Sequence, residues 1–156
     1  MVLNHIMLNM FHILIDADGC PVVGQTIDMA QEYQVPVILV CDTSHIFHEP
    51  YATLLMADKG KDQSDFLLLK HVHAGDIVIT QDYGLASLAL AKGAIPLSQN
   101  GLRYHEGNMD QLLQSRHEHA KMRKHKQYGH IPKRTAQADI DFMDALETIL
   151  LEKLEK

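Results

Sequence analysis

Short apolar runs rich in branched residues alternate along the chain with segments in which apolar residues recur every three or four positions. The runs predict buried strands at residues 11–15, 35–40, 52–57, 77–80 and 94–97. The segments between them predict helices at residues 23–34, 66–72 and 83–92. Strands that alternate with helices through short links are typical of a parallel sheet. The pattern therefore predicts an α/β fold, a three-layer domain whose mostly parallel sheet has helices on both faces.

The last third of the chain predicts two further helices joined by a basic segment. Asn108 is placed to cap a helix that continues to about residue 119, and Thr135 is placed to cap the final helix. An apolar stripe of that final helix is expected to pack onto the body of the domain, and it comprises Ile140, Met143, Leu146, Ile149 and Leu150. Residues 116–134 hold half of the chain's fourteen lysines and arginines, interleaved with histidines and one tyrosine.

Length and composition limit what the chain can be. With 156 residues and 46% hydrophobic content it can bury one sizeable core, so we expect one domain over residues 11–156, with residues 1–10 as a leader or an alternative start. Charged or polar residues interrupt every apolar run, so we expect no membrane span. Two cysteines suit a reduced, cytoplasmic protein better than a disulfide framework. The net charge of −6 gives no overall attraction to nucleic acid.

Aspartates gather at positions that a parallel sheet brings to its carboxyl edge, where ligands bind in such folds. They are Asp16 and Asp18 after the first strand, Asp62 and Asp65 before a helix, and Asp82 after the strand at 77–80. Adjacent carboxylates repel one another unless a cation or a proton lies between them. Hard divalent ions favour oxygen ligands, so the pattern predicts a site for Mg2+ or Mn2+. Turn formation and capping by Asp62 or Ser64 are the ordinary alternatives.

A divalent ion at this edge would suit phosphoryl chemistry, because it could activate water and stabilise a phosphoryl transition state. We expect all five aspartates to belong to the metal site: Asp16, Asp18, Asp62, Asp65 and Asp82. Asp16 and Asp82 are expected to be direct ligands and catalytic residues. The others are expected to complete the site or to hold the attacking water. The residues thus predict a metal-dependent hydrolase.

Three motifs resemble the bacterial YaiI/YqxD family, which is largely uncharacterised. They are DADGCPV at residues 16–22, GKDQSD at residues 60–65 and GDIVITQD at residues 75–82. The likeness extends to residues 100–104 and 142–146. The family is similar to PIN-like domains, whose active members are ribonucleases that use Mg2+ or Mn2+ held by acidic residues. The resemblance implies a PIN-like fold, the same five aspartates as the metal site, and RNA as the partner.

Two other functions fit parts of the sequence. An apolar strand that ends in Asp16-Ala17-Asp18-Gly19 is also similar to the opening motif of haloacid-dehalogenase-type phosphatases, in which the first Asp is the nucleophile and the second an acid or base. Thr80 could match the second motif of that superfamily, but no later lysine and paired aspartates complete the set. A helix that begins straight after Pro21 also leaves no room for a flap. The third alternative is a non-catalytic module that binds RNA or a partner protein.

The basic segment is the candidate nucleic-acid surface. Lysines and arginines can neutralise phosphates, and His or Tyr rings can stack on bases. The contacts are expected to come from Lys121, Arg123, Lys124 and Lys126. The alternative is that these charges only solvate a helix end, as most charge runs do. A zinc site at His117, His119 and His125 has little support, because no Cys or carboxylate lies at a matching spacing.

Overall fold

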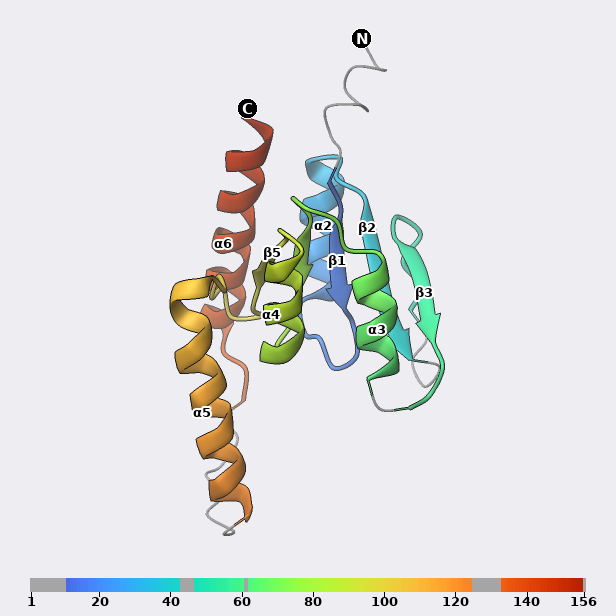
Figure 1. The fold of residues 1–156 in the computed structure, drawn as a ribbon. Helices are drawn as coiled ribbons and strands as arrows, with labels where there is room; N and C mark the ends of the chain where they lie inside the picture. Colours follow the sequence, from blue (N-terminus) through green and yellow to red (C-terminus); the bar gives the residue numbers. More distant parts are fainter. Residues whose placement is uncertain (1–10, 43–46, 61, 125–132, 156) are drawn as a thin grey trace.

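The computed structural model of the chain describes residues 11–42, 47–60, 62–124 and 133–155, with the backbone alone over 116–124. The strands are β1 (Ile13–Asp16), β2 (Val37–Asp42), β3 (Thr53–Ala57), β4 (Ile77–Ile79) and β5 (Ile95–Leu97). They form one sheet in the order β3-β2-β1-β4-β5, and all neighbouring pairs are parallel (Figure 1). The carboxyl ends of the strands therefore lie at one edge, as the sequence predicted.

Helices cover both faces of this sheet. In the described residues they are α2 (Val23–Glu32), α3 (Gln63–Lys70), α4 (Tyr83–Ala91), α5 (Glu106–Lys124) and α6 (Ala136–Leu154). α3 and α4 share one buried cluster with the sheet, α2 and α6 share another on the opposite face, and α5 packs against the outside of α4 (Figure 1). The predicted three-layer α/β architecture is confirmed. No helix in the described part of the chain is both long and apolar enough to cross a membrane.

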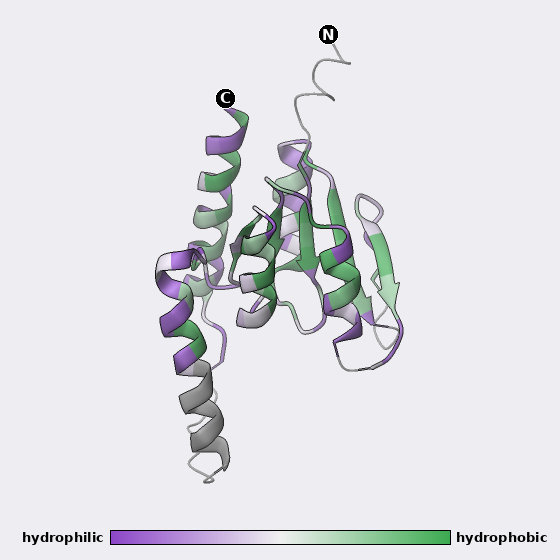
Figure 2. Ribbon diagram, viewed as in Figure 1, coloured by the Kyte–Doolittle hydropathy of each residue, from purple (hydrophilic) through white to green (hydrophobic). Residues whose placement is uncertain are grey.

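β1 lies at the centre of the sheet because both of its faces are apolar. Ile13, Leu14 and Ile15 have no exposed surface. Ile13 and Ile15 belong to the cluster with α2 and α6, and Leu14 between them belongs to the cluster with α3 and α4. A strand covered on both faces has a continuous apolar run instead of an alternating one, which explains why the sequence predicts it so clearly. Figure 2 shows hydrophobic strands in the middle of the domain and hydrophilic residues on its outer helices.

Two of the predicted helix caps are wrong. α5 begins two residues before Asn108, whose side chain instead accepts a hydrogen bond of 2.9 Å from the backbone N–H of His105. Asp62 does precede α3, but its backbone is left-handed, with φ 65°, and its side chain makes no capping hydrogen bond. Ser64 lies inside that helix. The cap predicted at Thr135 is confirmed, because its hydroxyl accepts a 3.1 Å hydrogen bond in the first turn of α6.

The final helix buries a different stripe from the predicted one. Three of the expected residues are buried: Leu146, Ile149 and Leu150. Ile140 and Met143, however, are 51% and 38% exposed, and Phe142 is fully buried in their place. At about 100° per residue, Phe142 lies on the same side of the helix as Leu146 and Ile149, whereas Ile140 lies on the opposite side. α6 has more apolar residues than the buried side of the helix can hold, and the prediction included two that stay exposed.

Candidate functional site

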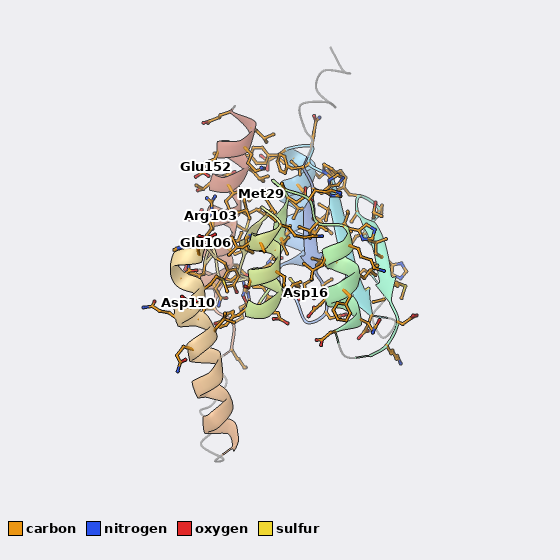
Figure 3. All side chains as sticks on the ribbon, viewed as in Figure 1. Asp16, Met29, Arg103, Glu106, Asp110 and Glu152 are labelled. Atoms are coloured by element: carbon orange, nitrogen blue, oxygen red, sulfur yellow. The ribbon has the colours of Figure 1, made fainter. Side chains whose placement is uncertain are left out.

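The five predicted aspartates gather at the carboxyl edge of the sheet. Asp16 is the last residue of β1, where Figure 3 labels it, and Asp18 lies in the loop that follows. Asp82 comes just after β4 and directly before α4. Asp62 and Asp65 reach the same edge because α3 begins there, after the loop that follows β3 (Figure 1). Both helices direct the positive ends of their dipoles toward the aspartates.

Asp16 is held by Thr80, a fully buried residue that directly follows β4. The Thr80 hydroxyl donates a 2.9 Å hydrogen bond to Asp16 Oδ2 and accepts one of 3.0 Å from the backbone N–H of Asp82. Burial raises the pKa of Asp16 to about 6; the Thr80 hydrogen bond opposes the rise, and the negative charges of Asp82 and Asp18 add to it. The charged form of Asp16 is therefore less stable than that of an ordinary aspartate, and a bound cation would relieve this.

Asp65 and Asp82 form a close carboxyl pair. A hydrogen bond joins their side chains, and Asp82 Oδ1 also accepts a 3.1 Å hydrogen bond from the Leu85 N–H, which caps α4. Burial, followed by the charges of Asp82, Asp16 and Asp62, raises the pKa of Asp65 to about 6. Ionising Asp65 is therefore more costly than ionising an ordinary aspartate, and a bound cation would lower that cost.

Two residues at this edge were not predicted in the roles they have. β2 runs two residues past the predicted strand and ends at Asp42, which adds another carboxylate to the edge. Its backbone N–H donates a 2.9 Å hydrogen bond to Asp18 Oδ2. The sequence held a signal for Asp42, since it ends the second branched run as Asp16 ends the first. No local pattern pointed to Thr80 as the residue that fixes Asp16, because the two are 64 positions apart.

The donor set fits a hard divalent cation in its chemistry. Every predicted ligand offers carboxylate oxygens, the donors that Mg2+ and Mn2+ prefer. The raised pKa values arise in part from other aspartates: Asp82 and Asp18 act on Asp16, and Asp82, Asp16 and Asp62 act on Asp65. Within the described residues, no three His, Cys, Asp or Glu side chains already converge as a metal-binding group. Coordination would therefore require these side chains to rotate toward a common point.

A second polar group borders the loop after β1. Burial raises the pKa of Cys20 to about 11, so its thiol stays protonated and is no nucleophile. The Gln99 side chain hydrogen-bonds to Cys20, and the Gln99 backbone N–H donates a 2.8 Å hydrogen bond to Gln81 Oε1. Arg134 in turn donates to the Gln99 carbonyl at 2.6 Å and to Asp139 Oδ1 at 2.8 Å. This last residue of the basic segment is thus engaged within the protein.

The rest of the predicted nucleic-acid surface lies largely outside the described residues. The side chains of Lys121, Arg123 and Lys124 are not described, nor is any part of Lys126. The backbone of α5 is described to Lys124, and Figure 1 shows it continuing past the carboxyl edge of the sheet. The backbone of residues 116–124, the part of the basic segment that belongs to α5, therefore extends toward the side of the molecule that holds the aspartates. Its contact with nucleic acid stays a prediction.

The chain is similar to a family of bacterial proteins and to several of its members. The family model described as "Uncharacterized BCR, YaiI/YqxD family" matches residues 14–152. A UPF0178 protein of Alkaliphilus oremlandii is 47% identical over 131 residues, which cover 83% of this chain and 84% of the relative. UPF0178 proteins of Natranaerobius thermophilus and Clostridium acetobutylicum are 43% and 40% identical, over 90% and 89% of this chain and 96% of each relative. No solved structure matches the chain significantly.

Proposed function

Because the chain belongs to the uncharacterised YaiI/YqxD family, its function has to be inferred from the candidate site, and we propose that it is a metal-dependent nuclease that hydrolyses RNA phosphodiesters. The observation behind the proposal is the gathering of five aspartates from three segments, with the pKa of Asp16 and of Asp65 raised to about 6. A fold that keeps poorly compensated carboxyl groups together loses stability. Strongly shifted pKa values of this kind are concentrated at functional sites.

Each aspartate has a role in this proposal. Asp16 and Asp82, from the ends of β1 and β4, are the direct ligands of Mg2+ or Mn2+. Asp18, Asp62 and Asp65 complete the site and orient the attacking water, while Thr80 positions Asp16 through its 2.9 Å hydrogen bond. When bound, the divalent ion supplies charge neutralisation at the phosphate and makes water more acidic.

Two features favour a polymeric phosphodiester over a small phosphate ester. α5 extends past the carboxyl edge and leads into a basic segment, which suits a substrate with phosphates on both sides of the bond that is cut (Figure 1). Only residues 17–22 separate β1 from α2, so no insertion between them could form the flap of a haloacid-dehalogenase-type phosphatase.

Cleavage of an end-labelled single-stranded RNA in Mn2+ tests the proposal. Wild-type protein should cut the strand, and both Asp16→Asn and a chelator should abolish cutting, because a neutral amide is a poor ligand for a hard cation. Asp28→Asn is the matched control, since Asp28 is exposed on α2 on the other face of the sheet. Cutting that persists in Asp16→Asn and in chelator would overturn the proposal. Release of phosphate from p-nitrophenyl phosphate, without RNA cleavage, would overturn the nuclease function and support a phosphatase function instead.

A further inference from the structure

An exposed aromatic residue directly follows one of the candidate metal ligands in the chain. Phe66 is 57% exposed, the largest value among the exposed large hydrophobic side chains of the described residues. It follows Asp65 in the first turn of α3, and its backbone N–H donates a 3.0 Å hydrogen bond to the Asp62 carbonyl. The ring is therefore attached to hydrogen-bonded helical backbone, one residue from one proposed ligand and four residues from another.

The neighbouring helix repeats this arrangement. Asp82, which shares a hydrogen bond with Asp65, is followed by Tyr83 in the first turn of α4. Tyr83 packs edge-on against the buried Tyr104, with ring centroids 5.8 Å apart and an interplanar angle of 65°. α3 and α4 contact each other on the same face of the sheet (Figure 1). Each member of the carboxyl pair is thus followed in the chain by an aromatic residue. The ring of Tyr83 packs within the protein, whereas the ring of Phe66 is open to solvent.

The surroundings of Phe66 favour a flat ligand over a protein partner. Residues three or four positions away adjoin it on the helix surface, and Asp62, Gln63 and Lys70 among them are polar or charged. A protein-docking patch needs contiguous apolar surface on the order of several hundred Å2, whereas a nucleobase needs only one face of a ring. A nucleotide also has the matching layout, because its flat base lies one sugar away from its phosphate.

We propose that Phe66 is a specificity-determining residue whose ring stacks on an unpaired nucleobase next to the phosphate held at the aspartates. This inference rests on the nuclease function proposed above and narrows its substrate to single-stranded RNA. In a duplex both faces of a base are already stacked, so the ring of Phe66 could reach one only after the base had been displaced from its helix. A single strand offers its bases without that displacement.

Steady-state kinetics on a labelled single-stranded RNA in Mn2+ test this role. Phe66→Ala should raise KM about tenfold with kcat nearly unchanged, a loss of the size expected when a stacking ring is removed. Phe66→Trp should retain the wild-type KM, because it keeps a flat aromatic face. Leu151→Ala is the matched control: Leu151 is also exposed, at 41%, but lies near the C-terminal end of α6. Its KM should stay at the wild-type value.

A strand with abasic sites on both sides of the cut bond removes the partner of the ring. Wild-type protein should show the raised KM on this strand, and Phe66→Ala should add no further loss. A complementary strand should protect the RNA from the wild-type protein. Equal KM for wild type and Phe66→Ala on the intact strand, or an undiminished effect of Phe66→Ala on the abasic strand, would overturn the stacking role.

Rapid mixing with an RNA that contains 2-aminopurine separates this inference from the proposed function. Stacking quenches the fluorescence of that base, and mixing records the quench before cleavage accumulates. Quenching by wild type and not by Phe66→Ala, without any cleavage, would support the stacking role and overturn the proposed nuclease function. Cleavage without a Phe66-dependent quench would support the proposed nuclease function and overturn the stacking role. The absence of both signals would overturn both.

Discussion

Asp16 and Asp65 each have a pKa raised to about 6, and burial is the first cause at both positions. A carboxyl group whose pKa is higher in the folded state binds its proton more tightly there than in the unfolded chain. The resulting stabilisation is fully present below the unfolded pKa of about 4 and is lost as the pH rises through the folded value. At neutral pH the metal-free protein therefore has a site that opposes folding, and neutralising one of its charges should stabilise the protein.

Asp16→Asn should accordingly raise the free energy of unfolding of the metal-free protein near pH 7. The amide retains an oxygen for the hydrogen bond from Thr80 but has no charge to desolvate. The rise in the pKa of Asp16 from 3.8 to about 6 sets a ceiling of about 3 kcal/mol, and we expect a gain of about 1–2 kcal/mol. Urea unfolding in chelator near pH 4 and near pH 7 measures it. The gain should be close to zero at the lower pH, and an equal gain at both would contradict the electrostatic origin.

Among the elements, the strands could be predicted from sequence and the contacts between their ends could not. The continuous apolar run of β1 marks a strand that is buried on both faces, and a parallel sheet then brings Asp16 and Asp82 to one edge. The hydrogen bond from Thr80 to Asp16 depends on which strands become neighbours, and no local pattern specifies that. The exposure of Ile140 likewise depends on how α6 docks, because its apolar residues exceed the surface available to them.

The turn at residues 98–101 shows how closely two elements approach. Gly101 has φ +89°, and a Cβ atom there would lie 2.5 Å from the backbone oxygen of Asp141 in α6. Gly101→Ala should therefore lower the free energy of unfolding by on the order of 2–4 kcal/mol, through backbone strain and this clash. Gly24→Ala in α2 is the matched control: a Cβ there meets nothing within 4 Å, so it should be neutral or stabilising by up to about 1 kcal/mol. Equal urea midpoints for the two variants would show that the turn can move away from α6.

The charge of the whole molecule is unevenly distributed. Its net charge is −6, yet residues 116–134 hold half of its fourteen basic residues. The backbone of α5 continues past the edge at which the aspartates gather, so charges of opposite sign approach the same end of the molecule (Figure 1). An RNA strand would be repelled by the metal-free aspartates and attracted by the basic segment. Association of RNA should therefore depend on that segment far more than the net charge suggests.

Neutralising Lys121, Arg123 and Lys124 together should weaken RNA binding and flatten its salt dependence. The loss of three phosphate contacts should reduce the slope of log K against log salt concentration by about 2 on a single strand. Fluorescence anisotropy of a labelled RNA over a series of NaCl concentrations measures both effects.

The matched triple variant neutralises the same number of charges at the C-terminal ends of α3, α4 and α6, at Lys70, Lys92 and Lys153. These ends point toward the opposite edge of the sheet (Figure 1), so this variant should bind RNA with a nearly unchanged slope. If both triples lower the affinity and the slope equally, only net charge acts on the RNA, and residues 116–134 are an ordinary solvated helix end. If only the first triple does so, the strand runs along α5 on its way to the aspartates.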